Sequence, residues 1–334
     1  MTAALAPAAE AFLRAHGYGD AARHPLPGDA GRRRYARLTG GPAPALLADC
    51  SAEPAADLHA FARVAGHLRT RGVRAPAVLA RDDSAGLMLV EDLGPSTMAE
   101  ALDAGADPVP LYAAAGRALR ALRDVPPLPD DLPRWDGAAM ADAAGATFLE
   151  WWWPAAMGGR APDAATRAAF REAVRETVAP FEARPRLVHR DYFPANLVPL
   201  PDGGGVGVLD VQDAALGHPA YDLASLVEDA RRDVSAEARA AALAAWGMEA
   251  DTQPAMAALG AVRHLRVAAL WVRLARRDGK PRYLAHGPRC WALLSRCLAH
   301  PAAAPLSAFL DSRVPVHLRA NPPSPESSSE VAAA

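Results

Sequence analysis

The amino-acid sequence predicts an α+β fold with two lobes: a small β-rich N-terminal lobe over residues 1–94 and a larger, mainly helical C-terminal lobe over residues 95–319. Three observations predict this division. The 334 residues allow about two domains at roughly 150 residues each. Hairpin patterns dominate the first third of the chain, whereas helical spacing dominates the rest. Between the two, the stretch Glu91-Asp92-Leu93-Gly94-Pro95 has the character of a hinge.

The elements of the N-terminal lobe follow from turn residues and apolar spacing. Gly-Gly-Pro at 40–42 separates two apolar runs, and Asp-Asp-Ser-Ala-Gly at 82–86 separates two more, which is the pattern of a β-hairpin. Between these hairpins, apolar side chains recur at helical spacing up to Gly72, a residue type that commonly ends a helix. The predicted order is a helix over residues 3–16, a hairpin over 32–50, a helix over 55–72 and a hairpin over 75–94.

The C-terminal lobe shows mostly the apolar periodicity of helices, interrupted by two short strands. The predicted helices cover residues 109–125, 164–182, 221–234, 235–248, 255–279 and 287–300, and the predicted strands cover 186–189 and 205–211. The last stretch, residues 320–334, is rich in Pro, Ser and Ala, so we expect a disordered tail.

Composition argues against several classes of protein. A net charge of −2 and a pI of about 6.6 give no general attraction to nucleic acid or to an anionic membrane. The chain has no signal-peptide pattern and no stretch of about 18 apolar residues free of charge, so we expect no membrane span. Cys50, Cys290 and Cys297 form no CxxC pair, which favours reduced thiols. We therefore expect a cytoplasmic monomer without nucleic-acid or membrane partners.

The stretch LVHRDYFPAN, residues 187–196, carries the chemistry. It places Asp191 after a strand and Asn196 five residues later, and a second strand ends at Asp210. Phosphoryl transfer needs an acceptor hydroxyl held in line and phosphate charge neutralised by Mg²⁺. We expect Asp191 to orient the hydroxyl and take its proton, and Asn196 and Asp210 to hold Mg²⁺ through oxygen ligands. His189 is expected to pin the loop backbone.

Together with GVLDVQDAALGHPAYDLASL, residues 207–226, this motif resembles the aminoglycoside-phosphotransferase superfamily of small-molecule kinases. Within it, the sequence is most similar to the anomeric N-acetylmuramate/N-acetylglucosamine 1-kinases of cell-wall recycling. GDAGRRRYARL, LADCSAEPAAD and HLRVAALWVRLARRDGKPRYL carry this narrower resemblance, which runs from about residue 10 to 315. It implies a bilobal protein-kinase-like fold with ATP between the lobes and an amino-sugar substrate on the C-terminal lobe. It also implies that Asp222 has a structural role, propping the catalytic loop or capping a helix.

Two departures from the kinase pattern concern the nucleotide phosphates. The third strand offers Asp49 where kinases carry a lysine, and Lys280 is the only lysine of the chain. The Gly-rich loop G-x-G-x-x-G is also absent. The stretch GDAGRRRY at 28–35 supplies glycines and three arginines instead, and an arginine fork suits phosphate oxygens. We take Gly31, Arg32 and Arg34 as nucleotide-binding candidates; a solvated strand edge is the alternative.

Further candidates follow from the resemblance. The backbone of Glu91, Asp92 and Leu93 is expected to bind adenine. On the acceptor side, Asp213 could face the sugar or cap a turn. In the run Trp151-Trp152-Trp153, we take Trp152 as a candidate for stacking on the sugar, with packing in the core as the alternative. Arg263 could bind a lactyl carboxylate or lie on a solvated helix face.

Three functions compete. The first is an ATP- and Mg²⁺-dependent kinase that forms sugar 1-phosphates. The second is a kinase of another small alcohol, such as an aminoglycoside, choline, ethanolamine or homoserine; the basic residues of 263–277 favour an anionic or neutral acceptor over these cations. The third is a nucleotide-binding pseudokinase, suggested by the missing lysine. The intact set Asp191, Asn196 and Asp210 argues against it.

Overall fold

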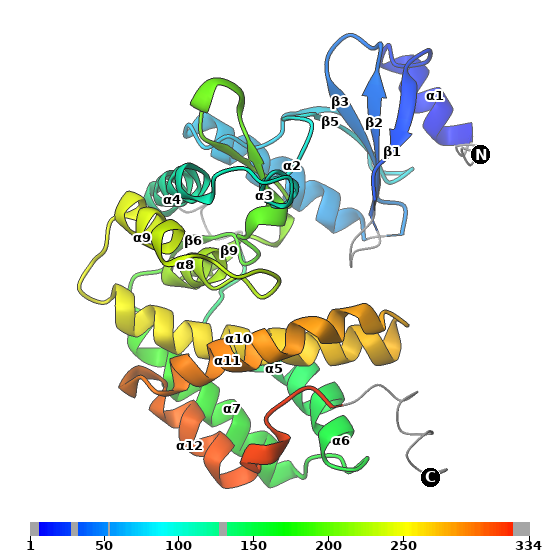
Figure 1. Cartoon of the computed structure of the whole chain (residues 1–334). Coiled ribbons are helices and arrows are strands. Elements are labelled where there is room, and N and C mark those ends of the chain that lie inside the picture. Colours follow the sequence, from blue (N-terminus) through cyan, green and yellow to red (C-terminus); the bar gives the residue numbers. More distant parts are fainter. Residues whose placement is uncertain (1–6, 28–32, 53, 127–131, 323–334) are drawn as a thin grey trace.

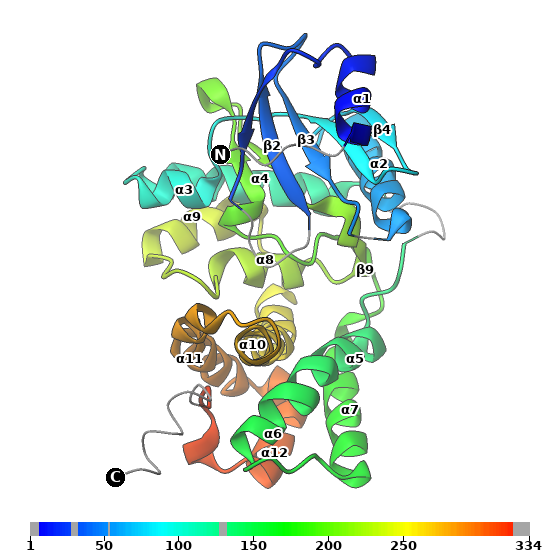
Figure 2. The same cartoon turned by 90° about the vertical axis from the view of Figure 1, so that its right-hand side faces the viewer.

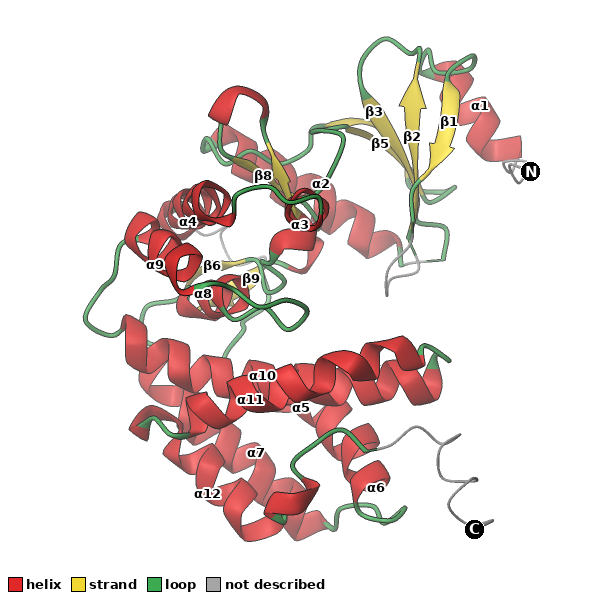
Figure 3. Ribbon diagram, in the orientation of Figure 1, coloured by secondary structure: helices red, strands yellow, loops and turns green. Residues whose placement is uncertain are grey.

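A sheet-bearing N-terminal lobe stands above a larger helical C-terminal lobe in this computed structural model (Figure 1, Figure 3). The structure describes residues 7–27, 33–52, 54–126 and 132–322. The predicted α+β fold class is confirmed.

The N-terminal lobe is a five-stranded antiparallel sheet in the order β1-β2-β3-β5-β4, with one helix on each face. Its elements are α1 (Pro7–Ala15), β1 (Ala22–Pro25), β2 (Arg34–Thr39), β3 (Ala45–Asp49), α2 (Ala55–Thr70), β4 (Val78–Asp82) and β5 (Leu87–Glu91). In β5, Leu87 and Leu89 join the core under α1, whereas Met88 and Val90 join the core under α2. This alternation is the two-residue period of a strand buried on both faces. Both predicted hairpins are present; β1 was not predicted.

The C-terminal lobe contains helices and two short antiparallel strand pairs, β6 with β9 and β7 with β8. The α-helices are α3 (Met98–Asp103), α4 (Pro108–Asp124), α5 (Gly137–Thr147), α6 (Trp153–Ala156), α7 (Ala164–Val178), α8 (Ala220–Val227), α9 (Ala236–Trp246), α10 (Thr252–Arg277), α11 (Gly287–Leu298) and α12 (Ala304–Arg313). The strands are β6 (Arg186–Val188), β7 (Leu197–Pro199), β8 (Val206–Val208) and β9 (Ala215–Gly217). A π-helical turn, η1 (Phe148–Trp152), joins α5 to α6, and short 3₁₀ turns are η2 (Ala179–Phe181), η3 (Pro194–Asn196), η4 (Pro201–Gly203), η5 (Val211–Asp213), η6 (Pro281–His286), η7 (Pro301–Ala303) and η8 (Val316–Leu318).

The helix predicted over residues 221–234 is shorter than expected. It ends at Val227, and the Asp229 carboxylate accepts a hydrogen bond from the Arg231 N–H at 2.9 Å. This Asx turn gives the backbone an alternative to the helix. The next helix, α9, starts after Ser235, whose hydroxyl accepts from the Ala238 N–H. The loop between the two helices therefore has its own local hydrogen bonds.

The long helix α10 runs beneath α8 in both views (Figure 1, Figure 2). By length and composition it is apolar enough to cross a membrane, but 83% of its apolar window is buried within the protein. It is therefore the central core helix of the C-terminal lobe. The three cysteines, Cys50, Cys290 and Cys297, are buried and form no disulfide bond.

Residues 320 and 321, the first of the predicted disordered tail, make hydrogen bonds with the C-terminal lobe. The Trp152 indole N–H donates to the Ala320 carbonyl oxygen at 2.8 Å, and the Trp291 indole N–H donates to Asn321 at 3.1 Å. These bonds fix the chain as far as residue 321. Residues 323–334 lie outside the described residues.

The packing of α4 against α9 yields a stability prediction. A Cβ at Gly116 would meet the Ala242 carbonyl oxygen well inside contact distance, whereas a Cβ at Gly66, in α2, would meet nothing within 4 Å. We expect Gly116→Ala to destabilise the protein by about 1–3 kcal/mol through overpacking. Gly66→Ala, the matched control, should stabilise it by about 0.5–1 kcal/mol. Urea unfolding of both variants measures this, and equal effects would contradict the assigned helix contact.

Candidate active site

The loop after β6 is held by the buried carboxylate of Asp222, in α8. Its two oxygens accept the backbone N–H groups of His189 at 2.5 Å and Arg190 at 2.8 Å. Arg190 has φ 76°, a left-handed conformation that a residue with a side chain rarely adopts. Asp222 therefore stabilises the strained turn that presents Asp191, and the predicted propping role is confirmed.

The His189 ring ties this loop to the strand that precedes Asp210. Its Nδ1 accepts the Asp191 N–H at 3.3 Å, so its Nε2 carries the proton and donates to the Leu209 carbonyl oxygen at 2.6 Å. The side chain is buried. The prediction that His189 pins the loop backbone is confirmed.

Asn196 and Asp210 lie at the same end of the β7–β8 pair. Leu197 pairs with Val208, and the Leu209 N–H continues the ladder by donating to the Asn196 carbonyl oxygen at 2.9 Å. The Asn196 amide nitrogen donates to the Asp191 carbonyl oxygen at 2.9 Å, which leaves its side-chain oxygen for a ligand. The amide and carboxylate oxygens fit a hard cation such as Mg²⁺. Their role as metal ligands stays a prediction.

The two candidate carboxylates are reachable from solvent, unlike the groups that position them. The side chains of Asp191 and Asp210 are 42% and 43% exposed. By contrast, Asp222 and His189 are at most 1% exposed. The site thus has an accessible reacting layer on a buried supporting layer, an arrangement that fixes geometry before a ligand binds.

Of the arginine run, Arg33 is the member that the structure brings to Asp210. Its Nη1 lies 3.7 Å from Asp210 Oδ1 and 3.3 Å from the Gln212 side-chain oxygen, and its side chain is only 7% exposed. Arg34 instead pairs with Asp49 at 2.8 Å and is 78% exposed. The predicted Gly31 and Arg32 lie outside the described residues. Strand alternation could have separated Arg33 from Arg34, since adjacent side chains point to opposite faces.

The predicted hinge is tied to the N-terminal lobe by its side chains. Glu91 pairs with Arg74, whose guanidinium lowers the pKa of the Glu91 carboxyl to about 2. Asp92 accepts from Arg37 at 2.6 and 3.2 Å, and Arg37 also donates to the Gly94 carbonyl oxygen. Leu93 is buried. The adenine contact of this segment stays a prediction.

The three candidates for the acceptor side have different placements. Asp213 lies near the loop, with its carboxylate 3.6 Å from Arg190. Trp152 is fully buried and stacks on Phe148, so no indole face is open to a sugar. Arg263 is 3% exposed, and its charge acts on Asp229 inside the lobe. Burial argues against substrate contacts by Trp152 and Arg263.

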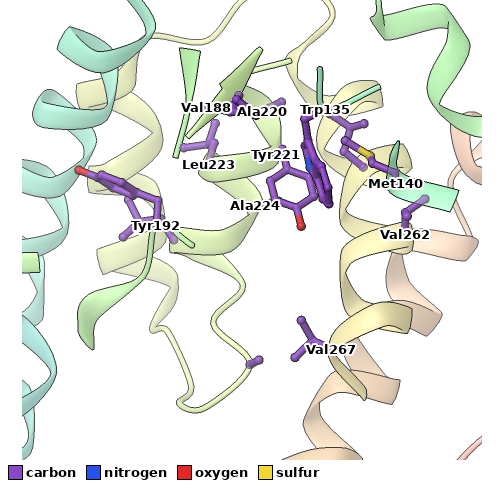
Figure 4. Packing of buried hydrophobic residues seen from close by; sticks show 14 of the residues in the cluster. Trp135, Met140, Val188, Tyr192, Ala220, Tyr221, Leu223, Ala224, Val262 and Val267 are labelled. Carbon is purple, nitrogen blue, oxygen red and sulfur yellow. The ribbon is translucent and has the colours of Figure 1, made fainter. Parts of the chain in front are cut away.

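Arg266, one turn after Arg263, is the arginine of α10 that approaches Asp191. Its Nη2 lies 3.9 Å from Asp191 Oδ1 and donates to the Tyr221 hydroxyl at 3.2 Å. Although burial opposes it, Tyr221 and Asp191 hold the pKa of Arg266 above its usual range. Figure 4 shows Tyr221 beside Trp135. The guanidinium of Arg190 lies over the Trp135 ring, 4.0 Å from the ring centroid. The sequence gives no local signal for this grouping.

A second polar cluster lies in the core of the C-terminal lobe. In the described residues, Glu228, His264 and Cys297 place possible ligand atoms within 4.8 Å of one another. The His264 ring donates to Glu228 at 2.9 Å, and Arg239 lies 3.4 Å from the same carboxylate. Burial raises the pKa of the Cys297 thiol, which keeps it protonated. The cluster is a buried hydrogen-bond network, in which the His264 Nδ1 has no partner among the described residues.

Comparison with known proteins places this geometry in a family. The family described as "Phosphotransferase enzyme family" matches residues 23–259. A curated protein of Caulobacter vibrioides named N-acetylmuramate/N-acetylglucosamine kinase is 38% identical, covering 92% of this chain and 96% of its own. A protein of the same name from Pseudomonas aeruginosa is 34% identical, covering 86% and 87%.

Solved structures share the fold at low sequence identity. A choline/ethanolamine kinase family protein from Mesorhizobium loti matches with a TM-score of 0.59 and 18% identity, over 91% of this chain and 98% of its own. The aminoglycoside phosphotransferase APH(3'')-Id from Streptomyces rimosus, in complex with ADP and streptomycin, matches with a TM-score of 0.56 and 22% identity, over 78% and 97%. The predicted bilobal fold is therefore confirmed.

The carboxylate of Asp222 gives the loop a pH dependence. Burial raises its pKa to about 6, although the His189 and Arg190 N–H groups oppose the shift. When the loop opens to water, Asp222 regains its ordinary, lower pKa, so below about pH 6 only the closed loop holds the extra proton. Because this proton uptake favours the closed loop, we expect hydrogen-exchange protection of these two amides to be roughly tenfold higher at pH 5 than at pH 7.5.

The control variants separate this effect from a general opening of the protein. Asp222→Asn should show low protection at both pH values, because the amide side chain never offers two acceptor oxygens. Asp213→Asn, with an exposed side chain, should behave like the wild type. Equal protection of the wild type at pH 5 and pH 7.5 would show that Asp222 does not control the loop.

Proposed function

This chain belongs to the phosphotransferase enzyme family, and from that premise we propose that it is an ATP-dependent kinase that phosphorylates the anomeric hydroxyl of N-acetylmuramate and N-acetylglucosamine. The observation that carries the proposal is the assembly of Asp191, Asn196 and Asp210 around one supported loop. The names of the two relatives supply the substrate class. We assign nucleotide binding to residues 1–94 and catalysis and sugar binding to residues 95–319.

The residues of the loop would perform the proton and positioning steps. Asp191, 42% exposed, would accept a hydrogen bond from the anomeric hydroxyl and take its proton as the oxygen attacks the γ-phosphorus of ATP. The bond from the γ-phosphorus to the β–γ bridging oxygen breaks, and ADP leaves with that oxygen. Asn196 and Asp210 would hold Mg²⁺. When bound, this ion neutralises charge on the phosphate oxygens. Asp222 and His189 hold the part of the site that binds the acceptor hydroxyl in a fixed position relative to the part that binds the phosphate donor.

The adenine site is proposed at the connector. The Glu91 N–H donates to the Ala77 carbonyl oxygen and the Asp92 N–H to the Pro44 carbonyl oxygen. Among the described residues, none accepts the Leu93 N–H, so this amide is the donor that adenine would use. The free, buried thiols support our prediction of a cytoplasmic enzyme. We further predict that it acts as a monomer in cell-wall recycling.

The second candidate is phosphorylation of choline or an aminoglycoside, which the names of the structural neighbours raise. The charges around Asp191 disfavour it. Arg266 lies 3.9 Å from the Asp191 carboxylate, and Arg190 lies beside it in the same turn. A cationic acceptor at Asp191 would also meet the Arg266 guanidinium, and like charges in a site repel by several kcal/mol in order of magnitude.

Direct phosphoryl-transfer assays test the proposal. We expect purified protein with Mg²⁺ and ATP to yield a sugar 1-phosphate from both amino sugars, read by phosphorus NMR, and no product from kanamycin or choline. Asp191→Asn should lower turnover by about 10²-fold or more, because a general base contributes roughly that factor. Phosphate on kanamycin or choline would overturn the substrate, and ATP binding without product would favour a pseudokinase.

Arg33 should serve the nucleotide phosphates in place of the missing lysine. Because Arg33 lies beside Asp210, we expect Arg33→Gln to lower kcat/KM for ATP by roughly tenfold or more. This is the loss expected when one charge-assisted hydrogen bond is removed. Arg34→Gln removes the neighbouring charge from an exposed pair and should change it by less than about threefold. Similar losses in both variants would indicate a general charge effect.

A further inference from the structure

The acceptor side of Asp191 is lined by cationic and aromatic side chains. Arg266 approaches Asp191 from α10, and the Arg190 guanidinium lies 4.0 Å from the centroid of the Trp135 ring. Arg231 covers the Phe193 ring at 4.5 Å. Arg33, by contrast, lies with Asp210 and Gln212. Positive charge is therefore present on the acceptor side independently of the group that we assign to the nucleotide phosphates.

Several donors on this side have no acceptor. The Nε atoms of Arg190 and Arg266 and the indole nitrogen of Trp135 are buried, and no described residue accepts a hydrogen bond from them. Trp135 is 6% exposed as a whole. Buried polar groups in native proteins are nearly always satisfied, so a cluster of unsatisfied donors indicates a ligand rich in acceptor oxygens.

Arg273 extends this donor set along α10. It follows Arg266 by seven residues, which places both on one helix face with a rise of about 10 Å. Its Nε is likewise buried without an acceptor among the described residues. Burial lowers the pKa of Arg273, the charges of Arg277 and Arg266 add to this, and Asp278 opposes it. The positive charges on this face thus remain incompletely neutralised.

We propose that Arg266 and Arg273 form a subsite for the lactyl carboxylate of N-acetylmuramate, and that Arg273 determines specificity for the acidic sugar. The inference rests on the proposed function and deepens it. We place the anomeric hydroxyl at Asp191 and the lactyl group of carbon 3 along the face of α10 that carries Arg273. N-acetylglucosamine lacks the carboxylate and would occupy the same position without this contact.

The variant Arg273→Gln tests the subsite, because Arg266 lies too close to Asp191 for its loss to be selective. We expect KM for N-acetylmuramate to rise by about tenfold or more, as for loss of a charge-assisted hydrogen bond, and KM for N-acetylglucosamine to change by less than about threefold. The methyl ester of N-acetylmuramate adds a chemical control. The wild type should bind it more weakly than the acid, and the variant should not distinguish the two.

Arg277→Gln is the matched control on the same helix. Its side chain is 49% exposed and already pairs with Asp278 at 2.7 Å, so both sugars should keep their KM values within about twofold. Equal losses for both sugars in Arg273→Gln, or no loss for either, would overturn the subsite. If the wild type phosphorylates neither sugar, the proposed function itself fails, and that result is distinguishable from a failed subsite.

Discussion

The site depends on one buried carboxylate. Asp222 has no exposed surface, and burying a charge is costly unless strong donors surround it. The donors here are two consecutive backbone N–H groups, and making both available requires the left-handed turn at Arg190. The helix that carries Asp222 thereby dictates the backbone of the segment that carries Asp191. The two hydrogen bonds offset both the strain of the turn and the desolvation of the carboxylate.

Hydrogen bonds that start from this turn fix the positions of the other residues of the site. The His189 ring connects Asp191 to Leu209, and Asn196 connects back to the Asp191 carbonyl oxygen. The N-terminal lobe joins through the backbone, since the Val208 N–H donates to the Arg74 carbonyl oxygen at 2.7 Å. Phosphoryl transfer depends chiefly on positioning and electrostatics, and this chain of contacts supplies the positioning.

Local patterns in the sequence predicted the elements and the loop, but not which side chains from distant segments of the chain meet. The spacing of Asp191, Asn196 and Asp210 is a property of one strand-loop-strand segment, so it is visible in sequence. The prediction of Arg263 as a substrate-binding residue missed Arg266, the arginine beside Asp191, because the phase of α10 depends on how α8 packs against it. Arg33 was passed over for its neighbours for the same reason, since its partner lies 177 positions later, at Asp210.

The near absence of lysine shapes the electrostatics of the site. An ammonium is a single point of charge, whereas a guanidinium offers five N–H donors in a planar fork. Arg33 and Arg266 can therefore each approach an aspartate and still direct other N–H groups toward a ligand. Arginine also does not lose its proton in the physiological range, so the positive charge of the site is fixed. The position of each arginine therefore sets the charge on each side of Asp191. In this way a single fold keeps the side that binds the phosphates separate from the side that binds the acceptor.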